Sequence, residues 1–181
     1  EVLKGYGKVL KGNKVSVTTD GINTEYTAKN IIVATGARSR VLANIPQDGK
    51  KIIGYRDAMT LKSAPKKMVI VGSGAIGVEF AYFYKAMGSE VTIVEFMPNI
   101  VPVEDVDISK QLARSLKKSG IKIMTNASVE SVDTKGSGCK VLVKGKKGEE
   151  TIECDVVLSA VGIEANIENI GLEEVGIKTE R

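Results

Sequence analysis

The 181-residue sequence contains no histidine and no tryptophan, and only 4% of its residues are aromatic. Without histidine, no Ser–His or Cys–His nucleophile system can form, and the commonest general acid–base residue is missing. The shortage of aromatic rings argues against platforms for stacking nucleic-acid bases. Any chemistry that this chain supports therefore depends on a bound cofactor.

Only two cysteines occur, Cys139 and Cys154, and their spacing fits neither a C-x-x-C pair nor a disulfide framework. We interpret them as small, semi-buried strand residues, and we expect no metal site. No run of 18 apolar residues is present, so no membrane partner is expected. The net charge is +4, with lysines concentrated in residues 135–147. A solvated hairpin face explains these lysines better than a nucleic-acid site.

The first 36 residues alternate apolar and polar positions between turn motifs such as Asp20-Gly21. This pattern predicts a β-meander. The next apolar stretch, Ile31–Val33, predicts a buried strand that ends in the small-residue turn Ala34-Thr35-Gly36. Residues 38–64 carry several proline and glycine breakers, and we interpret them as an irregular linker.

Three continuous apolar runs follow, and such runs are typical of parallel strands that are covered on both faces. Helical patterns separate them, which is typical of βαβ units. After the third run, the chain returns to strand-like alternation. We expect strands at 68–71, 91–94 and 121–124, alternating strands between 129 and 158, and helices at 75–87, closed by Gly88, and at 108–118, with Asp107 as N-cap and Gly120 after it.

An internal echo links the two strand-rich regions. A shift of 126 positions places Ile31-Ile32 on Val157-Leu158 and Gly36 on Gly162, with matching turn spacing before them. Chance agreement between apolar strands is the alternative. We interpret the echo as two domains of one topology, of which only the second keeps its βαβ unit. The chain starts in a strand-like pattern at residues 1–3, and we expect it to be a piece of a longer protein.

A glycine-rich motif, Gly72-Ser73-Gly74-Ala75-Ile76-Gly77, follows the first apolar run and opens the next helix. Its glycines suit a tight turn, close approach of a pyrophosphate to the backbone, and close helix–strand packing. The helix N-terminus favours negative charge. The sequence therefore predicts dinucleotide binding.

Glu95 ends the next strand, where a carboxylate would accept hydrogen bonds from the adenine ribose and repel a 2′-phosphate. The following residues, Phe96–Ile100, include no lysine or arginine, so NAD is favoured over NADP. A solvent-facing strand end is the alternative for Glu95. Glu79 is expected in the first helical turn, where it is either a site residue or a carboxylate that the helix dipole favours.

The segment VIVGSGAIGVEFAYFYKAMGSEVTIVEF resembles the NAD domain of the flavin-dependent pyridine nucleotide-disulfide oxidoreductases. The segments GYGKVLKGNKVSV, AKNIIVATGARSR and SAVGIEANIENIGLEEVGI resemble the lipoamide branch of that family, so the resemblance covers essentially the whole chain. It implies a homodimeric flavoenzyme that oxidises protein-bound dihydrolipoamide through a redox disulfide and FAD, and passes a hydride to NAD⁺. The implied partners are lipoyl domains and the acyltransferase core of 2-oxo-acid dehydrogenase complexes. The implied location is the bacterial cytoplasm, favoured here, or the mitochondrial matrix.

The resemblance also implies roles for individual residues. Those near NAD are Gly72, Ser73, Gly74, Ala75, Ile76 and Gly77 at the pyrophosphate, Glu95 at the ribose, Val129 at the adenine, and Glu79 and Gly162 near the nicotinamide. Those near FAD are Gly7, Thr35, Gly36 and Ala37.

The sequence also departs from the family pattern. The C-x-x-x-x-C disulfide, the flavin domain's glycine loop, the Gly-Asp flavin motif and the His-Glu base are absent. We therefore assign no catalytic residue and expect the chain alone to be inactive. Ile163–Asn166 replace the usual Arg-x-Pro-Asn, and Ala75 is smaller than the branched residue common at its position.

Together these observations predict an α/β, Rossmann-like FAD/NAD(P)-binding fold in which a parallel sheet is combined with a β-meander. We expect one whole NAD domain and part of an FAD domain. The expected parts are a truncated FAD-domain meander at 1–40, a linker at 41–64, the NAD domain at 65–162 and a segment returning toward the FAD domain at 163–181. Two alternatives remain open: the NAD domain of an NADH oxidase, mercuric reductase or ferredoxin-type reductase, and a nucleotide-sensing module without chemistry.

We expect the purified chain to be colourless. The residues assigned to FAD are few, and the main phosphate loop of a flavin domain is absent, so FAD should not be retained. An absorption spectrum of freshly purified protein checks this. A stoichiometric flavin band would contradict the interpretation of residues 1–40 as an incomplete flavin domain.

Overall fold

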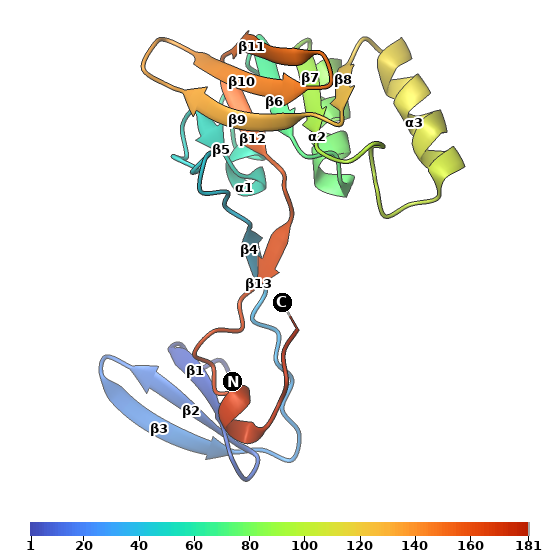
Figure 1. Cartoon of the computed structure of the whole chain (residues 1–181). Helices are drawn as coiled ribbons and strands as arrows, with labels where there is room; N and C mark the ends of the chain where they lie inside the picture. Colours follow the sequence, from blue (N-terminus) through green and yellow to red (C-terminus); the bar gives the residue numbers. More distant parts are fainter. Residues whose placement is uncertain (181) are drawn as a thin grey trace. The chain divides into compact units, whose positions relative to one another are not determined.

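The computed structural model describes residues 1–180, which form two compact units (Figure 1). The smaller unit contains the chain up to Arg38 and from Glu164 onward, and the larger unit contains Ser39–Ile163. Two short strands, β4 (Ala37–Ser39) and β13 (Ile163–Ala165), carry the chain between the units and pair with each other. No helix in residues 1–180 is long and apolar enough to cross a membrane.

The smaller unit contains an antiparallel meander of β1 (Tyr6–Leu10), β2 (Lys14–Thr19) and β3 (Ile22–Thr27). Only Asp20 and Gly21 separate β2 from β3, and both have positive φ angles, 50° and 80°. This is the geometry of a two-residue hairpin whose twist matches that of its strands. The predicted meander is confirmed.

The C-terminal segment completes the smaller unit. The backbone N–H of Val9 in β1 donates to the carbonyl oxygen of Ile170 at 2.8 Å. Ile170 and Leu172 are buried, and the 3₁₀ turn η1 (Glu173–Val175) follows them. The meander therefore gains its apolar cover from residues that are far away in the sequence.

Residues 28–36, which follow β3, form no strand, so the predicted buried strand at Ile31–Val33 is wrong for this chain. Ile32 is 91% exposed and Val33 is 42% exposed. A strand needs partners for its backbone N–H and C=O groups, and no described strand pairs with this segment. The expected strand at residues 1–3 is also absent.

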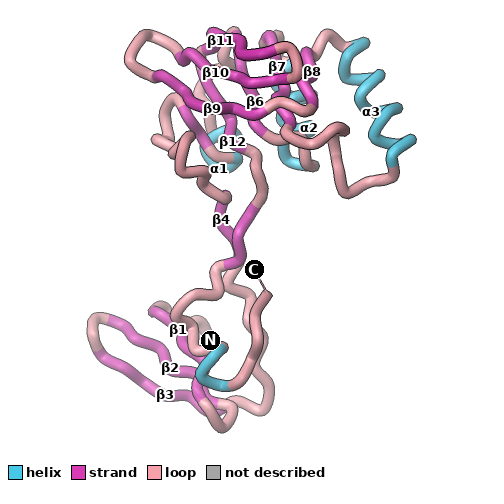
Figure 2. Tube along the Cα trace, viewed as in Figure 1, coloured by secondary structure: helices cyan, strands magenta, loops and turns pink. Residues whose placement is uncertain are grey.

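A five-stranded parallel sheet forms the centre of the larger unit, in the order β5-β12-β6-β7-β8. Figure 2 shows its strands β6, β7, β8 and β12 in magenta. The three predicted apolar strands are confirmed as its members β6, β7 and β8. The bounds of the five strands are β5 (Ile52–Ile53), β6 (Lys67–Val71), β7 (Glu90–Glu95), β8 (Lys122–Thr125) and β12 (Val156–Ser159).

The parallel sheet is covered on both faces. Met68 and Ile70 of β6 pack in one apolar cluster with the helices, whereas Val69 and Val71 pack in another with a second sheet. Because both faces are buried, residues Met68–Val71 are all apolar, which explains the continuous run in the sequence. The covering elements are helices α1 (Tyr55–Ala58), α2 (Ala75–Ala86) and α3 (Val106–Lys118), and the antiparallel strands β9 (Ser128–Asp133), β10 (Cys139–Gly145) and β11 (Gly148–Cys154).

The sequence predicted an irregular linker at 41–64, and the structure instead builds this segment into the larger unit. Ile45 and Ile53 are fully buried, and Ala58 is nearly so. The segment also supplies β5, the edge strand beside β12. Its apolar stretches are too short to show a helical or strand period, so pattern analysis missed them.

Both predicted longer helices are confirmed, and each is followed by a glycine with positive φ, 95° at Gly88 and 83° at Gly120. The N-cap of α3 is Asp105, not Asp107 as expected. The Asp105 carboxylate accepts hydrogen bonds from two N–H groups of the first turn, at 2.8 and 3.3 Å. Asp107 instead pairs with Lys110 at 3.1 Å.

The sequence echo is present in the strand pairing of two hairpins. Lys14 lies opposite Thr27 in β2–β3, and Lys140 lies opposite Glu153 in β10–β11, the equivalent pairs under the 126-residue shift. The last strand breaks the echo, because β12 is buried between two parallel neighbours whereas residues 31–33 form no strand.

Asp105→Ala should lower the free energy of unfolding by about 1 kcal/mol, because it removes the side-chain cap of α3. Asp107→Ala is the matched control, since it removes only an exposed ion pair and should cost about 0.5 kcal/mol or less. Urea unfolding of both variants measures the difference. A larger loss for Asp107→Ala would place the cap at Asp107.

Candidate functional site

A cavity of about 750 Å³ lies at the carboxyl ends of β6, β7 and β12 in the larger unit. Its volume is within the range of about 300–1,000 Å³ that is usual for small-molecule sites. In open α/β sheets, ligands bind at this edge. Residues 71–76, 94–97, 102–103, 127–129 and 160–163 line the cavity, together with Arg40 and Leu42.

Two of the three loop glycines are required by packing. Gly72 has a φ of +96°, and a Cβ on it would lie 2.5 Å from the carbonyl oxygen of Ala160. A Cβ on Gly77 would collide with the carbonyl oxygen of Gly72. The N–H of Gly72 donates to the carbonyl oxygen of Val94 at 2.9 Å, which ties the turn to the neighbouring strand.

Gly74 has a different environment, because a Cβ on it would meet no atom within 4 Å. It is the N-cap of α2, and Ala75 and Ile76 after it also line the cavity. The first N–H groups of a helix lack intrahelical partners and form the positive end of its dipole. No acidic side chain lies in the first turn of α2 as described. This end of the cavity is therefore suited to an anionic group.

Glu95, the last residue of β7, is only 7% exposed. Its Oε2 accepts hydrogen bonds from the backbone N–H of Ser73 at 2.8 Å and from the Ser73 hydroxyl at 2.6 Å. Its Oε1 accepts from the backbone N–H of Met97 at 2.8 Å. The alternative of a solvent-facing strand end is therefore wrong. An ionised carboxylate has about four acceptor positions, so one position remains at Oε1 for a ligand.

The loop after β7 also holds the glycine-rich loop at a second point. The N–H of Val101 donates to the carbonyl oxygen of Ser73 at 2.9 Å. Val101 has a φ of +40°, a strained conformation for a β-branched residue. Hydrogen bonds to its carbonyl oxygen from the Glu104 N–H, at 3.0 Å, and the Ser109 hydroxyl, at 3.3 Å, help to maintain it.

Glu79 is not among the residues that line the cavity. Helix α2 begins at Ala75, so Glu79 lies in the second turn and not in the first turn as expected. Its side chain is exposed. The larger unit therefore brings the glycine-rich loop and Glu95 together, but not Glu79.

Val129 and Gly162 line the same cavity as the glycine-rich loop and Glu95. Sequence analysis missed several other lining residues, among them Ser128 and Arg40. Among the described lining residues, Arg40 is the one cation, and it comes from the segment next to the expected linker. Its position depends on tertiary packing, so no motif could have identified it.

The residues assigned to FAD lie in the smaller unit. Gly7 is in β1, and a Cβ on it would meet no atom within 4 Å. The side chain of Asn166 donates to the carbonyl oxygen of Thr35 at 3.1 Å, and its backbone N–H donates to that of Gly36 at 2.9 Å. Hydrogen bonds therefore fix Thr35 and Gly36 to the chain segment that returns from the larger unit.

Arg38 forms a second connection of the same kind. Its guanidinium pairs with Glu168 at 2.7 Å and with Glu164 at 3.1 Å. Hydrogen bonding to Arg38 lowers the pKa of Glu168 to about 2. No group of three or more Cys, Asp and Glu side chains among residues 1–180 is arranged to hold a metal ion.

The whole chain matches the family model for pyridine nucleotide-disulphide oxidoreductases, over residues 1–181. It is 42% identical over 183 residues to dihydrolipoyl dehydrogenase of Zymomonas mobilis, covering 100% of this chain and 39% of that protein. It is also 42% identical over 182 residues to the mitochondrial dihydrolipoyl dehydrogenase 2 of Arabidopsis thaliana, covering 99% of this chain and 36% of that protein.

Among solved structures, that of LpdA from Mycobacterium tuberculosis is similar to the whole chain. The TM-score is 0.86 with 32% sequence identity, and the match covers 100% of this chain and 40% of that one. The chain thus spans about two fifths of the length of the proteins it matches. The Rossmann-like α/β fold that the sequence predicted is confirmed.

Gly77→Ala should destabilise the larger unit by about 1–3 kcal/mol, because the new Cβ would overlap the backbone of the glycine-rich turn. Gly74→Ala is the matched control, since its Cβ would enter open space and should change stability by about 0.5 kcal/mol or less. Thermal unfolding monitored by circular dichroism compares the two. Equal losses would mean that Gly74 is also a packing glycine.

Proposed function

Because the chain belongs to the pyridine nucleotide-disulphide oxidoreductase family, we propose that its larger unit binds NAD and that its parent is a dihydrolipoamide dehydrogenase. The names of the similar proteins from Zymomonas mobilis and Arabidopsis support the lipoamide branch over the other reductases. A nucleotide sensor without chemistry would not account for these relatives. The parent would oxidise protein-bound dihydrolipoamide and reduce NAD⁺.

The observation that carries the proposal is the buried carboxylate of Glu95 in the wall of the cavity. It stands beside a glycine-rich turn that leaves a helix N-terminus open to the same cavity. Its remaining acceptor position suits a ribose hydroxyl, and its charge would oppose a 2′-phosphate. NAD is therefore favoured over NADP.

The other cavity residues divide between the two ends of the nucleotide. Gly72–Gly77 would bind the pyrophosphate through backbone N–H groups at the start of α2. Val129 would contact the adenine, and Gly162 would lie near the nicotinamide. Arg40, the cation in the lining, adds attraction for the phosphates. When bound, NAD supplies a hydride acceptor, while these residues bind and orient it.

The smaller unit is proposed as part of an FAD domain, with Gly7 and Thr35–Ala37 near the flavin. The exposure of Ile32 and Val33 supports this, since two apolar side chains that follow a meander suit a strand with a partner in the parent. Glu79, exposed on α2, would act near the flavin and nicotinamide of the parent. The chain alone has no proposed catalytic residue.

The remaining proposals concern the parent protein. We propose an FAD-domain part at residues 1–38 and 164–181 and an NAD-binding domain at residues 39–163, which takes in the expected linker at 41–64. We propose a homodimer that acts with lipoyl domains and the acyltransferase core of 2-oxo-acid dehydrogenase complexes. A bacterial cytoplasm is favoured over a mitochondrial matrix, while relatives of both origins occur.

The chain should bind NAD⁺ at least about tenfold more tightly than NADP⁺, which corresponds to about 1.4 kcal/mol. Glu95→Gln removes the charge and keeps the size, so it should weaken NAD⁺ binding and narrow that ratio several-fold. Isothermal titration with both nucleotides measures the ratio, which does not depend on the fraction of folded protein.

Glu90→Gln is the matched control, because Glu90 is exposed at the opposite end of the same strand. It should leave both affinities unchanged. Equal binding of NAD⁺ and NADP⁺ by the unmodified chain, or an unchanged ratio in Glu95→Gln, would contradict the role assigned to Glu95.

A further inference from the structure

The two cysteines, which are fifteen positions apart in the sequence, lie directly opposite each other in the structure. Cys139 begins β10, Cys154 ends β11, and they form a cross-strand pair. Both are free thiols, 2% and 6% exposed. The expectation of two small strand residues is confirmed, but their separation in sequence concealed that they are neighbours.

Their spacing is compatible with a covalent bond. Opposed residues in an antiparallel pair have Cα atoms about 4.5 or 5.5 Å apart, and disulfides span about 4.4–6.8 Å. A bond between them requires no change in strand register.

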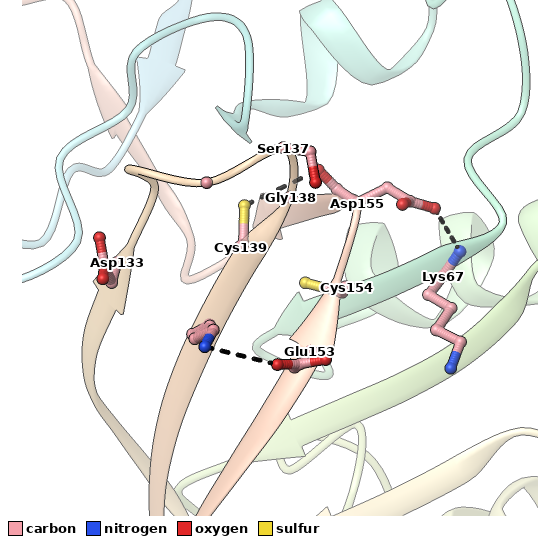
Figure 3. A pocket seen from close by; sticks show the side chains of 10 residues that line it. Lys67, Asp133, Ser137, Gly138, Cys139, Glu153, Cys154 and Asp155 are labelled. Carbon is pink, nitrogen blue, oxygen red and sulfur yellow. Dashed lines mark hydrogen bonds and ion pairs between the residues drawn. The ribbon is translucent and has the colours of Figure 1, made fainter.

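A second cavity, of about 340 Å³, gives small molecules access to this pair (Figure 3). Cys139 and Cys154 both line it, and so does the 136–138 loop before β10. The Cys139 thiol lies 3.8 Å from the carbonyl oxygen of Lys51 and 3.7 Å from that of Asp155. None of the residues lining the proposed NAD cavity lines this one.

We propose that Cys139 and Cys154 are a modification site, a dithiol that hydrogen peroxide oxidises to a cross-strand disulfide. One thiolate attacks a peroxide oxygen, the O–O bond breaks, and the leaving hydroxide takes up a proton to become water. The resulting sulfenic acid is attacked by the second thiol, the S–O bond breaks, and a second water leaves. Two electrons pass from the two sulfurs to the peroxide, and the two thiol protons leave in the two water molecules.

The surroundings of the pair determine how fast this reaction proceeds. Burial raises the pKa of both thiols, that of Cys154 to about 12. The Lys51 ammonium opposes the rise at Cys139, so we expect Cys139 to ionise first. The other charged groups that face the pair are Asp48, Lys67, Asp133, Lys140, Glu153 and Asp155.

Because the thiolate is the nucleophile, oxidation should be slow near pH 7 and should become faster toward about pH 9. The reaction is slow at neutral pH because the two thiols are buried. This slow oxidation distinguishes the pair from the cysteines of a catalytic disulfide, which react quickly. The proposal goes beyond the proposed function, since it depends neither on NAD nor on flavin.

The test treats the folded 181-residue chain with hydrogen peroxide, blocks remaining thiols with an alkylating agent, and digests the protein with trypsin without reduction. Cleavage after lysine gives one peptide of residues 136–140 and another of residues 148–178, neither of which contains methionine. The expected product is these two peptides joined, lighter than their sum by two hydrogen atoms. Oxidation of methionine elsewhere cannot imitate this product.

Cys139→Ser and Cys154→Ser are the matched variants, and neither can form the joined peptide. The oxidised unmodified chain should also unfold at a Tm about 5 °C or more higher, because the bond closes a loop in the unfolded state. Two alkylated thiols after treatment, a disulfide between two chains, or sulfinic acid at either cysteine would overturn the proposal. Oxidation should not change the affinity for NAD⁺. A failure of the disulfide proposal can therefore be distinguished from a failure of the proposed function.

Discussion

The site depends on one buried charge, the carboxylate of Glu95. An ionised group in the interior is costly unless its oxygens receive hydrogen bonds, and Glu95 receives them from Ser73 and from the backbone of Met97. These bonds join the loop after β6 to the loop after β7. The N–H of Ala127 adds a third segment by donating to the Glu95 carbonyl oxygen at 3.0 Å. The same carboxylate thus ties the two loops together and forms part of the cavity wall.

That carboxylate can be buried only because the parallel sheet is covered twice. The helices lie on one face and the β9-β10-β11 sheet on the other, so the last residues of β6 and β7 are buried up to the edge of the cavity (Figure 1). Continuous apolar strands are the direct consequence in the sequence. The parallel strands, α2, α3 and the glycine-rich loop could all be predicted because each has a local sequence pattern. The strands are continuous apolar runs, the helices have a helical period of apolar residues, and the loop has glycines at a characteristic spacing.

Other features depend on partners that the sequence does not place nearby. Asp105 and Asp107 are both residue types suited to an N-cap, and in the structure α3 begins at Val106, which makes Asp105 the cap. Arg40 lines the cavity but belongs to a segment whose sequence has no hydrophobic periodicity. Cys139 and Cys154 become neighbours through a hairpin register. In each case the deciding contact is tertiary, and local propensity could not reveal it.

The two copies of the echoed strand show the same limit most directly. Val157 and Leu158 are buried because β5 and β6 flank them, whereas Ile31 and Ile32 have the same kind of sequence without such neighbours. Burial of a strand is therefore a property of its sheet and not of its own residues. The glycines after both segments nevertheless keep positive φ angles, 72° at Gly36 and 113° at Gly162. The left-handed glycine conformation is therefore local and persists without the strand, although residues 34–36 form neither the predicted strand end nor a regular turn.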